Sequence, residues 1–264
     1  MSGKELAGKT AIVTGGAGAF GTATGHEFAA KGASVVVADI DGAAARRVAE
    51  EIGRKGGVSA LGLGCDVRQE TDVQKMVEMA VAAFSRVDVL VNNAGIFPIG
   101  PLAETTVETW DNIMAVNVRG VFLCSKHVIP HMIDQKSGCI VNISSAVGRM
   151  ALPNLVPYSA SKAAVIAMTV GLAKELGSHG IRVNAVCPSS VDTPGWAESK
   201  KALSSALGVP EDQVLDALIH GQVIKAMLTP EEIARVVSWL ASDDTSMVTG
   251  QAISIDGGSV FPTY

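Results

Sequence analysis

A tyrosine and a lysine stand four residues apart in the stretch YSASKAAVIAMTVGLAKEL, which starts at Tyr158 and has the composition of an apolar helix. Residues four apart lie on one face of a helix, so we expect the Lys162 ammonium beside the Tyr158 phenol. A free tyrosine has a pKa of about 10, and a neighbouring cation lowers that pKa because it favours the phenolate. The pair therefore predicts a proton-transfer group that works near neutral pH. Because this spacing also occurs by chance in many helices, it needs support from other residues.

A glycine-rich turn, TGGAGAFG, follows the first buried strand and opens the first helix, over residues 14–21. Small residues at such a turn let backbone N–H groups approach a pyrophosphate at the positive end of the helix. We expect the backbone around Gly15, Ala19, Phe20 and Gly21 to hold a dinucleotide there. Many glycine-rich turns are merely turns, so the motif also depends on its context.

Asp39 supplies that context, because it ends the second predicted strand. An acid that binds a ribose hydroxyl typically lies about 20 residues after the glycine turn, and Asp39 follows Gly21 at nearly this spacing. A carboxylate at this place would accept a hydrogen bond from the 2′-hydroxyl of NAD and would repel the 2′-phosphate of NADP. The residue that follows is Ile40 rather than a basic residue, and Arg46 and Arg47 lie farther along the next helix. The sequence therefore predicts NAD as the cofactor, with a solvated strand-end aspartate as the alternative interpretation.

The elements that position these residues follow an alternating pattern. Short β-branched runs at residues 10–14, 34–39, 87–93, 138–144 and 181–186 read as buried strands, and residues 58–67 as a weaker, glycine-interrupted one. Segments of helical period lie between them, as in Glu70–Phe84. Strands without alternation, each followed by a helix, indicate βαβ units and an α/β fold with a parallel sheet covered on both faces.

Length and composition exclude several classes of protein. The 264 residues include 48% hydrophobic and 18% charged residues and carry a net charge of −5, which indicates a globular protein without a nucleic-acid or anionic-membrane partner. We expect no apolar run to approach the roughly 18 residues of a membrane span, and the N-terminus lacks a signal peptide's apolar core. The four cysteines form no CxxC pair, so we expect no metal and a reducing, cytoplasmic location.

We expect one catalytic domain over residues 1–264, with a substrate-covering insertion at about 193–228. The insertion is more polar than its surroundings and reads as two short helices. A long segment at this place is usually functional. A further helix is expected to start after Thr229, its N-cap, with Pro230 in the first turn.

Four motifs together, TGGAGAFG, NNAG at residues 92–95, ISS at 143–145 and YSASK at 158–162, resemble the short-chain dehydrogenase/reductase family over essentially the whole chain. The resemblance implies a Rossmann-type, doubly wound parallel sheet of seven strands and nicotinamide chemistry. It also implies a catalytic group of Asn117, Ser145, Tyr158 and Lys162. Tyr158 would take the proton of an alcohol and Ser145 would bind the same oxygen. Lys162 would lower the tyrosine pKa and hold the nicotinamide ribose, and Asn117 would keep a water for proton relay.

The same resemblance implies further cofactor contacts, and the chain departs from the family pattern twice. Asp66 and Val67 match adenine contacts, Asn93 the segment that lines the cofactor, and Val191 and Thr193 the segment that holds the nicotinamide amide. Ala19 stands where the family usually has glycine, and its methyl group would crowd the diphosphate. Ser189 likewise replaces a glycine, either as a substrate contact or as a tolerated loop residue.

The helix that follows Tyr158 is apolar around nearly its full circumference, so it should be buried on all sides. A sheet covers only one side of it, and small residues such as Ala163, Ala167 and Gly171 would permit close approach of another subunit. We expect a homo-oligomer, a tetramer rather than a dimer.

We expect the reaction to interconvert a secondary alcohol and its ketone, the alcohol being a carbohydrate (a sugar or polyol) or a small cyclic alcohol. The alternatives are an NAD(P)H-dependent reductase of a 3-oxoacyl or other ketone, a dehydrogenase of a small anionic hydroxy acid, and a non-catalytic dinucleotide-binding protein. Lys200, Lys201 and Lys225 would favour an anion if they faced the substrate. The side chains expected nearest to the substrate are Ile96, Phe97, Asn154, Trp196 and His220.

Overall fold

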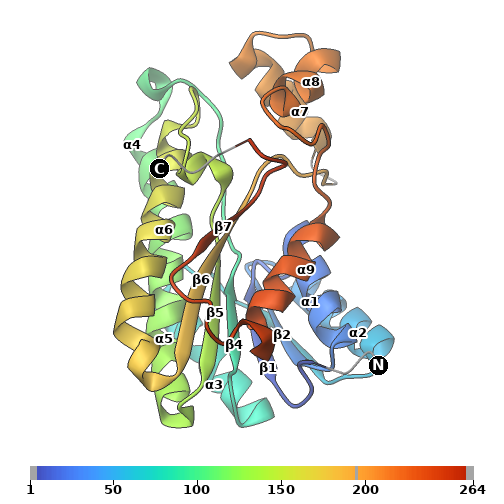
Figure 1. Cartoon of the computed structure of the whole chain (residues 1–264), viewed down its shortest axis with the longest axis vertical. Helices are drawn as coiled ribbons and strands as arrows, with labels where there is room; N and C mark the ends of the chain where they lie inside the picture. Colours follow the sequence, from blue (N-terminus) through green and yellow to red (C-terminus); the bar gives the residue numbers. More distant parts are fainter. Residues whose placement is uncertain (1–4, 194–195, 260–264) are drawn as a thin grey trace.

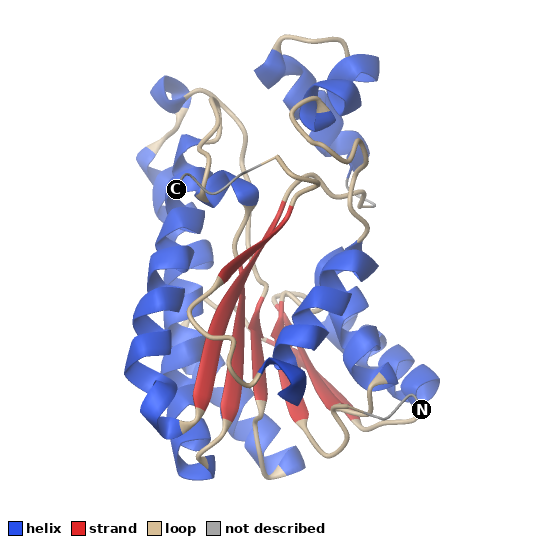
Figure 2. Ribbon diagram, viewed as in Figure 1, coloured by secondary structure: helices blue, strands red, loops and turns tan. Residues whose placement is uncertain are grey.

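A parallel sheet forms the centre of the computed structural model, which describes residues 5–193 and 196–259 (Figures 1 and 2). Within these residues the sheet has seven strands in the order β3-β2-β1-β4-β5-β6-β7. The strands are β1 (Thr10–Thr14), β2 (Ser34–Asp39), β3 (Ala60–Gly64), β4 (Val89–Asn92), β5 (Gly138–Ile143), β6 (Ile181–Pro188) and β7 (Ala252–Ile255). The α/β, Rossmann-type doubly wound fold is thereby confirmed.

Burial explains which segments become central strands. β1 and β4 are buried at every residue, as continuous apolar runs in a sheet with two covered faces should be. β3 lies at the edge and is only half-buried. Its Gly62 faces α2 so closely that a Cβ atom would overlap the backbone of Arg46. Gly62, one of the glycines that weaken the strand pattern, is therefore needed for helix-to-sheet packing.

Helices cover both faces of the sheet, and each face has its own hydrophobic core. One face carries α1 (Ala19–Ala30), α2 (Gly42–Gly56) and α9 (Pro230–Ala241). The other carries α3 (Glu70–Phe84), α5 (Gly120–Gln135) and α6 (Val156–Leu176). Figure 1 shows these two layers on opposite sides of the strands. Three other helices lie toward the carboxyl edge of the sheet: α4 (Val107–Met114), α7 (Trp196–Leu207) and α8 (Val214–Ile219).

The start of α9 follows the local signals of the sequence. Thr229 is the N-cap, and its hydroxyl accepts from the Glu232 N–H at 3.3 Å. The Glu232 carboxylate accepts from the Thr229 N–H at 2.8 Å, which completes a capping box. The helix therefore begins where the sequence predicts.

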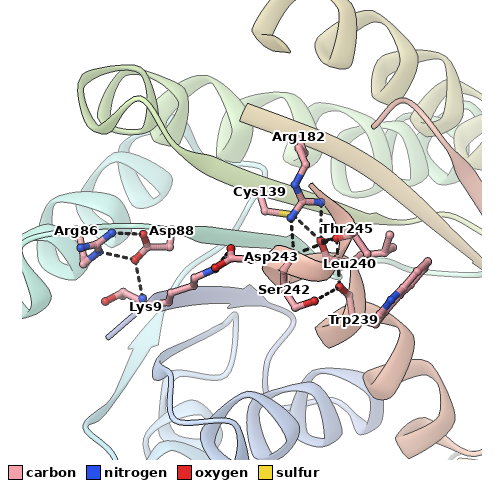
Figure 3. A network of polar contacts seen from close by, with 11 residues as sticks. Lys9, Arg86, Asp88, Cys139, Arg182, Trp239, Leu240, Ser242, Asp243 and Thr245 are labelled. Atoms are coloured by element: carbon pink, nitrogen blue, oxygen red, sulfur yellow. Dashed lines mark hydrogen bonds and ion pairs between the residues drawn. The ribbon is translucent and has the colours of Figure 1, made fainter. Parts of the chain in front are cut away.

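A polar network ties the amino edge of the sheet together (Figure 3). Arg182 on β6 donates to the carbonyls of Leu240 at 2.8 Å and Ser242 at 3.0 Å, at the end of α9. Lys9 pairs with Asp243 at 2.5 Å. The Arg86 guanidinium binds the buried Asp88 carboxylate, which also accepts from the backbone of β1. These contacts hold the edge opposite the functional residues.

α6 differs from expectation in two ways. With the turn that follows, Val156–His179, it is the one helix of the described residues that is long and apolar enough to cross a membrane, so the expectation that no segment reaches this length is wrong. It packs along β6 as a core helix, which passes the same test. Its other side, with Ala163, Ala167 and Val170, is exposed in the single chain rather than buried.

Candidate active site

A cavity of about 920 Å³ opens at the carboxyl edge of the sheet, where the strand order reverses between β1 and β4. Doubly wound sheets bind their ligands at such a point. Most of the predicted site residues line this cavity: Gly15, Ala19, Phe20, Asp39, Asp66, Val67, Asn93, Ser145, Tyr158, Lys162, Val191 and Thr193. Gly21 and Asn117 lie behind its wall, because Gly21 is packed within α1 and Asn117 is fully buried.

The start of α1 is built to receive an anion. Gly15 has a φ of +59°, and a Cβ atom there would lie 2.8 Å from the Ala94 Cα. A Cβ atom on Gly21 would overlap the Gly15 carbonyl, so the turn must be this tight. In the described residues no side chain caps the helix at Gly18, and its first turn holds no acid. The first N–H groups therefore face the cavity with a positive potential, which fits a dinucleotide diphosphate.

Ala19 does not distort this turn. It is the first residue of α1 and is absent from the residues with positive φ in the described backbone. An alanine adopts this backbone without strain, so the departure from the family pattern changes the cavity surface by one methyl group and leaves the turn unchanged.

Asp39 is held at the end of β2 beside the glycine turn. Its Oδ2 accepts from the Ala17 N–H at 3.0 Å, and its Oδ1 accepts from the Asp41 N–H at 3.1 Å. The carboxylate lines the cavity and is half-buried. The structure thus presents a fixed negative group at the cavity wall beside the glycine turn.

Arg68 is a cavity residue that the sequence reasoning missed. Its guanidinium binds the Asp66 carboxylate through three contacts of 2.7 to 3.0 Å, and it donates to the Asn112 Oδ1 at 2.8 Å. These hydrogen bonds lower the pKa of Asp66 from its ordinary value. The only sequence signal is the position of Arg68 two residues after Asp66, because Asn112 comes from the distant α4.

Asn93 connects the ends of two strands. Its amide nitrogen donates to the carbonyls of Thr14 and Gly15, both at 2.9 Å, and its backbone N–H donates to the Thr14 hydroxyl at 3.0 Å. The side chain therefore fixes the glycine turn against β4.

Tyr158 and Lys162 are brought together, but the expected acidification of the phenol is wrong for the chain by itself. The Lys162 Nζ lies 5.7 Å from the centroid of the Tyr158 ring and donates to the Ile143 carbonyl at 2.8 Å. Burial raises the pKa of Tyr158 to about 12, against which the hydrogen bond with Ser145 acts only in part. Burial likewise lowers the pKa of Lys162 to about 8. Desolvation opposes the charged form of both groups and is the largest cause of both shifts.

Ser145 lies at the cavity wall between Tyr158 and β6. Its hydroxyl donates to the Pro188 carbonyl at 3.4 Å and accepts from the Val147 N–H at 3.4 Å. These long contacts leave the hydroxyl able to turn toward a ligand oxygen. Ser144 instead donates to the Lys162 carbonyl at 2.8 Å, which fixes the start of α6.

Asn117 lies in a π-helical segment, Ala115–Arg119, between α4 and α5. Its side-chain oxygen accepts from the Ile96 N–H, and its nitrogen donates to the Ile96 carbonyl, both at 2.9 Å. The same nitrogen donates to Ser161 at 3.0 Å. Both amide hydrogens are used, so the side chain positions the Gly95–Ile96 backbone beside Lys162. π-Helical turns often mark functional sites.

The segment after β6 closes the cavity. Val191 forms a parallel bridge with Leu228, which joins the two ends of the 193–228 segment to each other. The Ser189 hydroxyl bonds the buried Gln222 side chain at 3.1 Å. In the amide orientation that satisfies its neighbours, Gln222 also donates to the carbonyls of Ile224 and Ala226. Ser189 therefore anchors the covering segment.

Of the five side chains expected near the substrate, some line the cavity and others do not. Ile96 and Phe97 line the cavity, and the Phe97 ring meets the Tyr158 ring edge-on, with centroids 5.3 Å apart. Asn154 donates to the Ala206 carbonyl at 2.7 Å, and His220 is exposed; neither lines the cavity. The Trp196 side chain lies outside the described residues.

Comparisons with known proteins agree with this geometry. The family model described as enoyl-(acyl carrier protein) reductase matches residues 15–260. The 3-oxoacyl-[acyl-carrier-protein] reductase FabG of Thermotoga maritima is 41% identical over 258 residues, which are 97% of this chain and 99% of the relative. The cis-4-hydroxycyclohexanecarboxylate dehydrogenase of Sinomonas cyclohexanicum is 39% identical over 257 residues, 97% of this chain and 98% of the relative.

A solved structure of NAD⁺-bound xylitol dehydrogenase superposes with a TM-score of 0.92 at 31% identity. The match covers 96% of this chain and 99% of that one. The relatives thus share the whole architecture while their names give different substrates.

Proposed function

The chain belongs to the short-chain dehydrogenase/reductase family and is an oxidoreductase with a dinucleotide-binding Rossmann-type fold, and from this premise we propose that it interconverts a secondary alcohol and its ketone with NAD. The observation that carries the proposal is the arrangement of Ser145, Tyr158 and Lys162 around one cavity that also presents Asp39. Among the described residues that line this cavity are the uncapped start of α1, which could bind a diphosphate, and the Tyr158–Lys162 pair, which could transfer a proton.

Each of the four predicted catalytic side chains has its own role in the proposed reaction. A bound oxidised nicotinamide would supply the hydride acceptor and a positive charge, and that charge would favour the phenolate form in which Tyr158 can take a proton. Ser145 donates a hydrogen bond to the substrate oxygen, and Tyr158 takes the proton that this oxygen loses. Lys162, fixed by the Ile143 carbonyl, holds a cation below the Tyr158 ring, and Asn117 holds the backbone that surrounds Lys162.

NAD rather than NADP is supported by the fixed carboxylate of Asp39, which would repel a 2′-phosphate. The cavity residues beside it, Ala17, Gly18 and Ile40, carry no positive charge. An NAD(P)H-dependent reductase of a 3-oxoacyl or other ketone substrate is the second candidate, favoured by the 41% identical relative, which is named as a 3-oxoacyl-[acyl-carrier-protein] reductase.

The experiment compares initial rates with NAD and NADP for a panel of secondary alcohols, and with NADH and NADPH for the ketones. We expect turnover with NAD to exceed that with NADP at least tenfold. Tyr158→Phe should lower kcat by at least a thousandfold while the affinity for NADH changes less than threefold, because the phenol hydroxyl serves the proton step. A preference for NADPH would overturn the cofactor assignment, and an active Tyr158→Phe variant would overturn the mechanism.

We also propose an oligomeric state and a cellular location for the protein. The exposed apolar side of α6, with Ala163, Ala167 and Val170, supports a homo-oligomer, for which we propose a tetramer. Sedimentation of dilute protein as a monomer would contradict it. All four cysteines are free and buried, which supports a reducing cytoplasmic location.

A further inference from the structure

The cavity continues beyond Tyr158 into a region that we call the substrate end. The apolar side chains that line it include those of Phe97, Val147, Met150, Leu155, Leu203 and Leu218. These side chains come from separate parts of the chain: the loop after β4, the segment between β5 and α6, and the covering helices α7 and α8. Phe97 and Met150 are 42% and 41% exposed although both are large and apolar. The walls around the reacting group are therefore apolar on several sides.

No described residue at the substrate end supplies a cation for an anionic substrate. The charged residues that line the whole cavity are Asp39, Asp66, Arg68 and Lys162 among those described. Arg68 is occupied by Asp66, and Lys162 is held by the Ile143 carbonyl. An anion placed here would lose its hydration without gaining a partner.

The lysines that could have favoured an anion lie elsewhere. Lys200 and Lys201 on α7 do not line the cavity, and Lys225 donates to the Ile219 and His220 carbonyls. The described geometry thus removes the reason for expecting a hydroxy acid.

A sugar or polyol fits the substrate end poorly as well. Its extra hydroxyl groups would need hydrogen-bond partners once buried. On the segment after β6 the Ser189 hydroxyl is engaged by Gln222, which leaves Ser190 and Thr193 at the cavity wall to meet the several hydroxyl groups of such a substrate. Ser145 and Tyr158 are required by the reacting oxygen itself.

We infer that the substrate is an uncharged secondary alcohol, or its ketone, whose body is an apolar ring packed against Phe97 and covered by Leu218; this rests on the proposed function. The ring carbon that bears the hydroxyl is oxidised to a carbonyl. Its hydride reduces NAD⁺ to NADH, and the hydroxyl proton passes to Tyr158 in its phenolate form.

The test measures kcat/KM by NADH absorbance for four alcohols: cyclohexanol, 2-propanol, myo-inositol and cis-4-hydroxycyclohexanecarboxylate. Cyclohexanol should exceed each of the others at least tenfold. Against 2-propanol the three added methylenes set a ceiling of about sixtyfold, since each buried methylene contributes about fourfold. A higher value for the polyol or the carboxylate would overturn the inference and leave the proposed function standing. Failure of every alcohol and of every ketone with both dinucleotides would overturn the two together.

Matched variants separate a wall of the substrate end from a structural residue. Leu218 lines the cavity, whereas Leu215 on the same helix is 37% exposed and does not. Phe97→Ala and Leu218→Ala should raise the KM for cyclohexanol at least fivefold while that for 2-propanol stays within twofold; Leu215→Ala should change neither. In the Tyr158→Phe variant with NADH, cyclohexanone should raise the Tm, and Leu218→Ala added to it should abolish this shift. An equal rise in KM for both alcohols would refute the inference. A Tm of the Tyr158→Phe variant with NADH that cyclohexanone leaves unchanged would refute it as well.

Discussion

Replacement of Lys162 by methionine should abolish activity and yet make the protein more stable at neutral pH. Lys162 is 4% exposed, and burial lowers its pKa from 10.5 to about 8. At 1.36 kcal/mol per pKa unit, the charged form costs the folded state about 3 kcal/mol. Methionine removes this cost but leaves the Ile143 carbonyl unpaired, a loss of about 1 kcal/mol. The expected gain in the free energy of unfolding is about 2 kcal/mol at pH 7.

The pH dependence identifies the cause of this gain. Between pH 8 and 10.5 the unfolded chain holds the Lys162 proton more tightly than the folded chain does, so wild-type stability from this group rises with pH. The advantage of Lys162→Met should therefore be full below pH 8 and should vanish toward pH 10. A simple packing improvement would persist at every pH.

Urea unfolding of both proteins at pH 7 and pH 9.5, at one protein concentration and without added dinucleotide, measures the difference. Lys174→Met is the matched control, because Lys174 lies on the same helix and is exposed. We expect the control to change stability by less than about 0.5 kcal/mol. A Lys162→Met variant no more stable than wild type at pH 7 would refute the reasoning that burial dominates this site.

Three other predictions address separate parts of the molecule. The chain has two tyrosines, Tyr158 and Tyr264, so the tyrosinate absorbance of the wild type minus that of Tyr158→Phe reports Tyr158 alone. Without dinucleotide this difference should titrate near pH 12, because burial disfavours the phenolate. A midpoint at or below pH 10 would contradict this expectation. Asp39→Asn keeps an acceptor for the Ala17 N–H but removes the charge, so the ratio of kcat/KM for NAD to that for NADP should fall at least tenfold; an unchanged ratio would exclude Asp39 as its determinant. Arg182→Met removes charged hydrogen bonds to the end of α9 and should lower the free energy of unfolding by about 2 kcal/mol in urea, with kcat of the folded protein unchanged.

The elements that were predicted most closely are those whose signals are local. β1 and β2 have the bounds that their β-branched runs indicate, and α3 has the bounds that its apolar periodicity indicates. The capping box at Thr229 starts α9 as expected. β7 was not assigned from the pattern, because its four residues are all half-buried and form the edge of the sheet. An edge strand of this length depends on its pairing with β6 rather than on its own composition.

The candidate site divides in the same way. The motif residues could be placed because parallel strands bring their carboxyl ends to one edge. The partners of these residues could not be placed, because they depend on tertiary contacts. The Ile143 carbonyl that holds Lys162, and the Ile96 backbone that uses the Asn117 amide, leave no mark in the spacing of side chains. The sign of the Tyr158 pKa shift was wrong for this reason, since spacing gives proximity but does not measure burial.

The amino and carboxyl edges of the sheet differ in how their polar and apolar groups are partnered, and this difference favours a ligand at the carboxyl edge in one orientation. At the amino edge, Arg182 and Lys9 are paired with the groups that close it (Figure 3). At the carboxyl edge the described residues include a helix terminus without a side-chain cap, a phenol and an amine whose charged forms burial opposes, and a large exposed phenylalanine. Each of these features is relieved by a different kind of group: an anion, a charged ring and an apolar body. Their order along one cavity, from Gly18 through Lys162 to Phe97, therefore predicts that a diphosphate, a redox-active ring and an apolar substrate lie in that sequence.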